Sequence, residues 1–144
     1  MSTDSLPASC QDRHKQSEAT ARRTGASAFA RRHGAQAAGV VNGVYLNAAR
    51  SRKTLNAALS RHSIGCLARL LTSKRLQSRV SIRSGSATAW RLVIRRPGKR
   101  PAYLDVAGLR NGRANALALF TSSGAPIRSS IERSALTAVA RRLR

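Results

Sequence analysis

The sequence predicts an α+β protein: a basic N-terminal arm, one or two helices, an antiparallel meander of three to four strands, and a C-terminal helix packed on one face of the sheet. Three observations predict it. The apolar spacing changes from three and four to two at Arg79, which marks a change from helix to strand. Asn111-Gly112 is a hairpin signal, and the last residues carry the apolar stripe of an amphipathic helix. We expect residues 1–39 to be a largely irregular arm and residues 40–144 to form a single small α+β domain.

Small and polar residues dominate the N-terminal arm, and three glycines there interrupt any helical pattern. Two arginine doublets lie in it, at Arg22-Arg23 and Arg31-Arg32. They are either solvated charges or phosphate contacts on an arm that folds only against nucleic acid, as arginine-rich segments often do. We favour the phosphate contacts.

A helical pattern is predicted from Val40 onward, because apolar residues recur at spacings of three, four and seven. Its stripe comprises Val41, Val44, Tyr45, Ala48, Leu55 and Leu59. Ser63 is expected to cap a second helical segment, whose stripe comprises Ile64, Leu67, Leu70 and Leu71. The two segments could be one bent helix or two separate helices. A helix-turn-helix is a further interpretation, although the second segment lacks polar base-reading side chains at its N-terminal end.

The clearest strand pair surrounds the turn-like residues Ser84-Gly85-Ser86. Apolar side chains alternate on one face, namely Val80, Ile82, Trp90, Leu92 and Ile94. Arginines alternate on the other face, namely Arg79, Arg83, Arg91 and Arg95. We therefore expect one buried and one arginine-studded sheet face. Trp90 could stack a nucleic-acid base, but its apolar companions favour a place in the core.

The C-terminal third continues this meander and ends in a helix. A stiff basic loop at residues 97–101 precedes a short strand at residues 103–106, and a further strand covers residues 114–121. Ser129 to Glu132 fit a capping box. The buried stripe of the following helix is expected to comprise Ile131, Ala135, Leu136, Val139 and Leu143.

Charge dominates the composition. The chain has 27 Lys and Arg against 5 Asp and Glu, a net charge of +22, and no acid between Glu18 and Asp105. Like charges at this density destabilise a compact state, so we expect a polyanion to supply the missing negative charge. The predicted nucleic-acid contacts are Arg22, Arg23, Arg31, Arg32, Lys53, Lys74, Arg75, Arg83, Arg91, Arg95, Arg96, Lys99 and Arg100.

These cations predict a structural RNA-binding protein of a large ribonucleoprotein, a ribosomal protein of bacterial or organellar type that contacts rRNA phosphates and neighbouring proteins. Cations over every predicted element favour this function over a DNA-binding protein of a bacterium or phage, which would concentrate them on one footprint. A basic membrane-surface or protein-interaction module is a further alternative. An unselected reading frame could share the composition, but not the agreement of its local signals with one architecture.

The stretch from Ala19 to Gly39 is rich in arginine, alanine and serine and has no acid, which is typical of mitochondrial targeting segments. Asp4, Asp12 and Glu18 precede it, where such segments avoid carboxylates. We expect a ribosomal location, in mitochondria rather than the bacterial cytoplasm. No apolar run approaches the roughly 20 residues that a bilayer span needs, so we expect no transmembrane segment.

Catalytic and metal-binding patterns are weak. Asp105 with Glu132 is a poor candidate for an acid–base pair, and we expect Asp105 to pair with neighbouring arginines. Cys10-x-x-x-His14 and His62-x-x-x-Cys66 have mirrored spacings that could form a Cys2His2 zinc set. We instead expect reduced, unligated cysteines, and we predict no metal, cofactor, small-molecule substrate or enzymatic activity.

Overall fold

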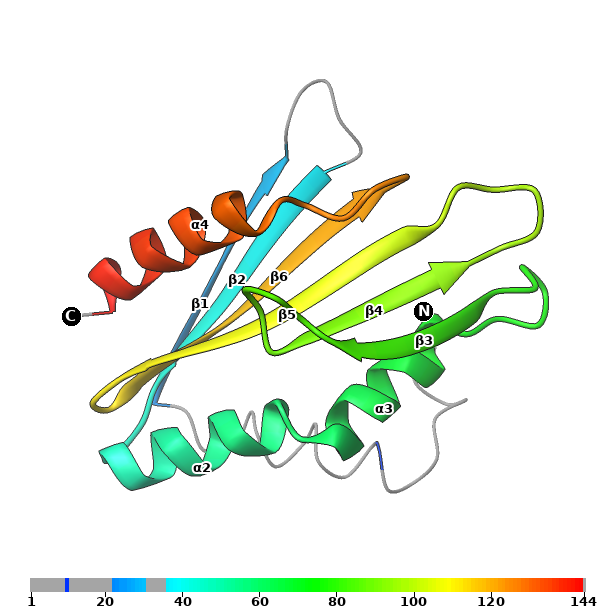
Figure 1. The fold of residues 1–144 in the computed structure, drawn as a ribbon. Helices are drawn as coiled ribbons and strands as arrows, with labels where there is room; N and C mark the ends of the chain where they lie inside the picture. Colours follow the sequence, from blue (N-terminus) through cyan, green and yellow to red (C-terminus); the bar gives the residue numbers. More distant parts are fainter. Residues whose placement is uncertain (1–9, 11–21, 31–35, 144) are drawn as a thin grey trace.

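The computed structural model describes Cys10, residues 22–30 and residues 36–143. Figure 1 shows the described elements around one sheet. They are, in chain order, β1 (Arg23–Ala30), β2 (Gln36–Val44), α2 (Ala48–Ala58), α3 (Arg61–Leu71), β3 (Arg79–Ser84), β4 (Trp90–Arg95), β5 (Ala102–Asn111), β6 (Ala114–Ser123) and α4 (Ser129–Arg142).

The sheet has six antiparallel strands in the order β1-β2-β6-β5-β4-β3. The α+β class is therefore confirmed, whereas the predicted count of three to four strands is too low. The two additional strands are β1 and β2, and β1 pairs with β2 along the whole length of β1. The expected boundary between residues 39 and 40 lies inside β2, so described residues of the expected arm belong to the sheet.

The expected helix from Val40 is wrong in its first turns, because residues 36–44 form β2. β-branched valines favour an extended backbone, and β2 is hydrogen-bonded to β6 along its whole length. The helix begins only after Asn47, whose side-chain Oδ1 accepts a hydrogen bond of 2.9 Å from the backbone N–H of Arg50. This side-chain cap satisfies one of the unpaired donors of the first helical turn.

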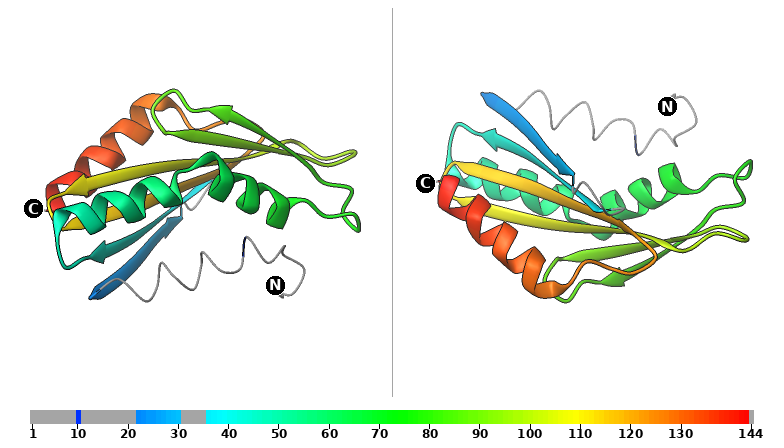
Figure 2. Two further views of the ribbon diagram at one scale, coloured as in Figure 1. Left: turned by 90° about the horizontal axis from the view of Figure 1, so that it is seen from below. Right: turned by 90° about the horizontal axis from the view of Figure 1, so that it is seen from above.

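α2 and α3 cover one face of the sheet (Figure 2). Ser60, rather than Ser63, caps α3. The core under α3 comprises Ile64, Ala68, Leu92, Leu104 and Val106. Trp90 packs against this core, and its indole N–H donates a hydrogen bond of 2.7 Å to the carbonyl of Leu59, between the two helices. The predicted core position of Trp90 is confirmed.

Glycine 108 allows α2 to approach the sheet closely. A Cβ atom added at Gly108 would lie 2.5 Å from Leu59 Cδ1 and 2.8 Å from Leu55 Cδ1. Both distances are shorter than real carbon contacts, so a larger residue at this position would force the side chains of Leu55 and Leu59 to move.

α4 packs on the opposite face, as the two views of Figure 2 show. Its core comprises Ala107, Ala118, Phe120 and Ile127, with Ala135 and Leu136 packed against it. Helices thus lie on both faces of the sheet. The predicted packing of the C-terminal helix on the sheet is confirmed.

The hairpin predicted at Asn111-Gly112 is confirmed, although Asn111 is the last residue of β5 and the turn itself consists of Gly112 and Arg113. Asn111 pairs with Ala114, which leaves a two-residue loop between β5 and β6. Gly112 in this loop has a φ of 55°, a left-handed conformation that glycine adopts without steric cost.

The capping box predicted for α4 is wrong. Arg128 occupies the N-cap without a side-chain hydrogen bond, and Ser129 Oγ instead lies 2.6 Å from Ser86 Oγ. Glu132 is fully buried against the sheet, while Ile131, expected in the buried stripe, is 39% exposed. Relative to the predicted buried stripe, α4 is therefore rotated about its axis, so that Glu132 and not Ile131 faces the sheet.

This rotation predicts unequal effects for two similar substitutions on α4. Leu136→Ala should lower the free energy of unfolding by about 2–3 kcal/mol, because Leu136 packs against the core beneath the helix. Ile131→Ala should cost less than about 1 kcal/mol, since the side chain is partly solvated. Urea unfolding of both variants measures the difference. Equal losses would contradict the rotation.

Candidate nucleic-acid interface

The described part of the chain has two carboxylate side chains, Asp105 on β5 and Glu132 on α4, and both are buried. Their exposed fractions are 1% and 0%. Register places Asp105 directly opposite Arg91 on β4. Arg91 Nε and Nη2 donate hydrogen bonds of 2.6 and 2.8 Å to the two oxygens of Asp105. The predicted ion-pair role of Asp105 is confirmed, and these hydrogen bonds raise the pKa of Arg91.

Glu132 completes this cluster from the other side. Its Oε1 lies 3.6 Å from Arg91 Nη2, and neither of its carboxylate oxygens has a hydrogen-bond partner among the described residues. Burial raises the pKa of Glu132 to about 8, helped by the adjacent Asp105 and opposed by Arg91. At neutral pH Glu132 is therefore largely protonated, which removes the charge repulsion between its carboxyl group and that of Asp105.

A buried carboxyl group of raised pKa beside a second carboxyl group resembles an acid–base pair in chemical terms. Here both side chains lie beneath α4 with almost no exposed surface, so a substrate would have to displace the helix to reach them. We assign Arg91, Asp105 and Glu132 to the attachment of α4 to the sheet.

The raised pKa predicts how stability depends on pH. Unfolded Glu132 loses its proton near 4.5, while folded Glu132 keeps it up to about 8. The folded state thus binds the extra proton between these values, and the free energy of unfolding should fall as pH rises through this window. Glu132→Gln cannot ionise, so its stability relative to the parent should rise between pH 5 and pH 9, by up to about 1.4 kcal/mol per pH unit. A constant difference in urea unfolding would show that folded Glu132 is ionised throughout.

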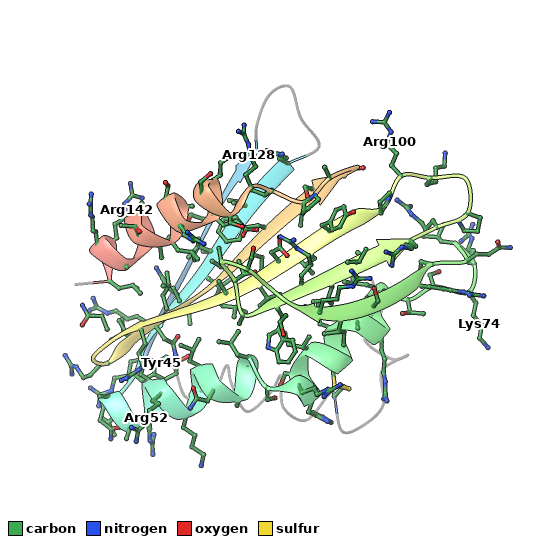
Figure 3. The ribbon with its side chains drawn as sticks, viewed as in Figure 1. Tyr45, Arg52, Lys74, Arg100, Arg128 and Arg142 are labelled. Atoms are coloured by element: carbon green, nitrogen blue, oxygen red, sulfur yellow. A yellow bond between two sulfur atoms is a disulfide. The ribbon has the colours of Figure 1, made fainter. Side chains whose placement is uncertain are left out.

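Every described Lys and Arg except Arg91 is exposed. Figure 3 shows these side chains around the sheet and both helical layers. Because the described carboxylates are buried, no exposed cation in this part of the chain has a described acidic partner on the surface. The described surface is therefore positive on several sides.

Several predicted contacts gather at the end of the sheet where β3 begins and β4 ends. Register places Arg79 opposite Arg95 there. The connection from α3 to β3 carries Lys74 and Arg75, and the loop after β4 carries Arg96, Lys99 and Arg100.

The other predicted contacts lie elsewhere in the fold. Arg83 lies near the far end of β3, Arg22 and Arg23 lie at the start of β1, and Lys53 lies on α2. Arg31 and Arg32 lie outside the described residues.

An open hollow with a volume of about 550 Å³ lies at this end of the sheet. We call it the basic hollow. Its lining comprises Thr72, Ser73, Lys74, Gln77, Ser78, Arg79, Arg95, Arg96 and Pro97. Four of these residues are cationic, and most of the rest carry hydroxyl or amide groups. Such a lining offers charge-assisted and neutral hydrogen bonds to phosphate and ribose oxygens.

The arginine pair at the basic hollow is electrostatically unfavourable by itself. Directly opposite residues on antiparallel strands have Cβ atoms about 4.5–5.5 Å apart, and like charges at this distance destabilise the pair. Arg95 Nη1 donates a hydrogen bond of 3.3 Å to Ser81 Oγ, which orients the side chain but adds no negative charge. An anion between Arg79 and Arg95 would remove the repulsion.

Two residues change their place in the predicted contact set. Arg91 was expected to contact phosphate, but its guanidinium is bonded to Asp105 and only 18% of its side chain is exposed. Arg79 was left out of that set although it lies in the basic hollow. Its alternation with Val80 in the sequence was the signal that could have included it.

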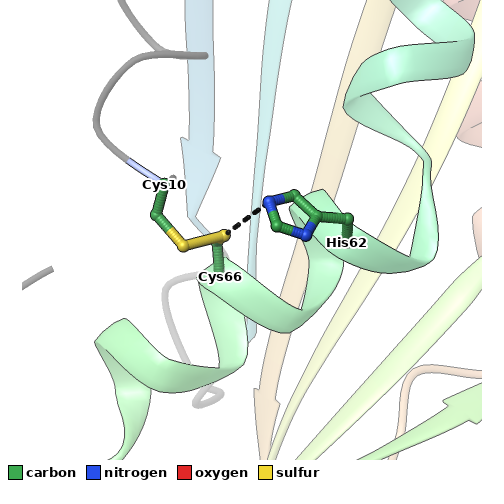
Figure 4. Close-up of side chains that lie close together, drawn as sticks. All are labelled: Cys10, His62 and Cys66. Atoms are coloured by element: carbon green, nitrogen blue, oxygen red, sulfur yellow. Dashed lines mark hydrogen bonds between the residues drawn. A yellow bond between two sulfur atoms is a disulfide. The ribbon is translucent and has the colours of Figure 1, made fainter. Parts of the chain in front are cut away.

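A second cluster joins the N-terminal segment to α3 (Figure 4). Cys10 and Cys66 form a disulfide, so the expectation of reduced cysteines is wrong. His62 Nε2 lies 3.7 Å from Cys66 Sγ, one helical turn away. The bond closes a loop between residues 56 positions apart, and a cross-link of this span stabilises a fold by about 4 kcal/mol in the chain-entropy description. His14 of the predicted zinc set lies outside the described residues.

We compared the chain with protein-family models, with curated proteins and with solved structures, and none of them matches it. Among the described helices, none is both long and apolar enough to cross a lipid bilayer. The function has to be inferred from the arrangement of the residues above.

Proposed function

We propose that this chain is a structural RNA-binding protein of a large ribonucleoprotein, namely a ribosomal protein that contacts rRNA phosphates. One observation carries the proposal: in the described part of the chain, both carboxylates are buried and every cation but Arg91 is exposed. A surface of this kind has its counter-charge outside the polypeptide. RNA phosphates supply charge at high density and along an extended path.

The distribution of the cations supports RNA on more than one side. Arg110 and Arg113 lie at the β5–β6 hairpin, and Arg141 and Arg142 end α4. In Figure 3, Arg142 lies at the opposite end of the molecule from Lys74 of the basic hollow. A protein that reads one DNA groove concentrates its cations on one footprint. A protein embedded in folded RNA meets phosphates on several faces, and the mixed basic and hydroxyl lining of the basic hollow suits backbone recognition.

Energetics favour the same function. Repulsion among uncompensated cations opposes folding, and a ligand that binds the folded form alone stabilises it by mass action. We therefore expect RNA to raise the melting temperature of the protein. The organellar, mitochondrial location favoured by the composition of residues 19–39 belongs to the same proposal.

The basic hollow predicts a specific loss of RNA affinity. The triple variant Lys74→Ala, Arg79→Ala and Arg95→Ala should weaken binding to a structured RNA. It should also reduce the slope of log K against log salt by about 2–3, since each lost phosphate contact contributes roughly 0.7–0.9. Filter binding over a salt series measures both quantities.

A charge-matched control separates a contact site from net charge. Arg133→Ala, Arg141→Ala and Arg142→Ala remove the same charge from exposed positions on α4. A smaller loss of RNA affinity for this control would support the basic hollow as the primary contact. Equal losses would mean that the interface depends on net charge alone.

Two further measurements test the rest of the proposal. Duplex DNA that competes as well as structured RNA at equal salt would contradict the RNA assignment. Failure to sediment with ribosomal particles after a high-salt wash would contradict the ribosomal location.

A further inference from the structure

The cluster of Cys10, His62 and Cys66 has the donor atoms of a metal site. α3 places His62 and Cys66 four residues apart, on the same face and one turn from each other. Cys10 reaches this face from the N-terminal segment. The two sulfurs and a ring nitrogen all lie within 4.8 Å of one another. Two thiolates and an imidazole form a donor set that Zn²⁺ prefers.

The distances suit tetrahedral coordination once the sulfurs are no longer bonded to each other. With Zn–S near 2.3 Å and Zn–N near 2.05 Å, a tetrahedral site separates sulfur from nitrogen by about 3.6 Å. The Cys66 Sγ to His62 Nε2 distance is 3.7 Å. The Cα atoms of the two cysteines are 5.8 Å apart, and side-chain rotation can separate their sulfurs to the roughly 3.8 Å of a shared zinc ion.

We propose that reduction of the Cys10–Cys66 disulfide opens a Zn²⁺ site formed by Cys10 Sγ, Cys66 Sγ and His62 Nε2, with the fourth position open to water. In the oxidised form both sulfurs belong to the S–S bond and neither is a thiolate, so the two cysteines cannot bind the ion. The site is therefore under redox control and goes beyond the proposed binding of RNA.

The redox step balances with a dithiol reductant. One thiolate of the reductant attacks a sulfur of the disulfide and forms a mixed disulfide, and its second thiol then displaces the protein sulfur. The protein gains two electrons and two protons as two thiols, and the reductant becomes a cyclic disulfide. Zn²⁺ binding then displaces both protons from the thiols.

Burial and charge suit an ion that is exchangeable and yet partly shielded. Cys10 is buried, Cys66 is half-buried and His62 is exposed, so water reaches the site from the histidine side. Two thiolates cancel the charge of Zn²⁺, and the ion adds no net charge to an already cationic chain. Either state ties residue 10 to α3, through a covalent bond when oxidised and through the metal when reduced.

Zinc titration of the full chain tests the site. A trialkylphosphine reduces the disulfide and becomes a phosphine oxide, whose oxygen comes from water. Competition with a chromogenic chelator then measures Zn²⁺ binding. We expect one Zn²⁺ per reduced chain and none at the same affinity per oxidised chain. Co²⁺ in place of Zn²⁺ should give a sulfur-to-metal charge-transfer band and the intense visible bands of a tetrahedral site.

Matched variants assign the ligands. Cys66→Ser should abolish the charge-transfer band or halve it, and His62→Ala should weaken Zn²⁺ binding by at least about tenfold. Arg61→Ala, on the same helix but without a donor for zinc, should bind like the parent. Zinc should also raise the melting temperature of the reduced parent and leave that of the oxidised parent unchanged.

Three results would overturn the proposal. One is that the reduced chain binds zinc no better than the oxidised chain, whether circular dichroism shows the reduced chain to be folded or not. Another is equal binding by His62→Ala and Arg61→Ala, which would remove the histidine from the site. The third is zinc binding without any rise in melting temperature, which would mean that the folded chain binds the ion no better than the unfolded chain does. Each would leave the disulfide as a purely structural cross-link.

Discussion

The bond between Arg91 and Asp105 is the interaction on which the rest of the structure depends. It joins directly opposite residues of the adjacent strands β4 and β5, and Arg91 also contacts the inward-facing Glu132 of α4. A buried ion pair costs desolvation energy unless its geometry is good, and here the contact is bidentate. The cluster also uses both described carboxylates, so it fixes α4 and leaves the described surface positive.

That positive surface constrains what the protein can do. Cations that no described carboxylate neutralises lie on the hairpins, on α2, on α4 and around the basic hollow. The core beneath them is built mainly from aliphatic side chains, which bury less area than aromatic ones. Modest burial and strong self-repulsion together favour a fold that gains stability from an anionic partner.

The N-terminal segment is attached to the domain in two ways. β1 adds to the edge of β2 through backbone hydrogen bonds, and Cys10 is joined to α3 through its sulfur. The first attachment is independent of redox conditions, while the second depends on them. A metal bound in the reduced state would keep the second attachment without the covalent bond. Residue 10 would then stay attached to α3 in both redox states.

The sequence by itself determined the features that depend on near neighbours: the α+β class, the alternation that separates Trp90 from the arginines, the Gly112 turn and the excess of positive charge. The tertiary structure decided which partners meet. Val41 fits a helical or a strand period, and only pairing with β6 selects the strand. Asp105 and Glu132 both meet Arg91, and Cys10 meets Cys66, because segments far apart in the chain pack together. Local periodicity assigns a side chain to a face, whereas its charge partner depends on contacts that no local pattern encodes.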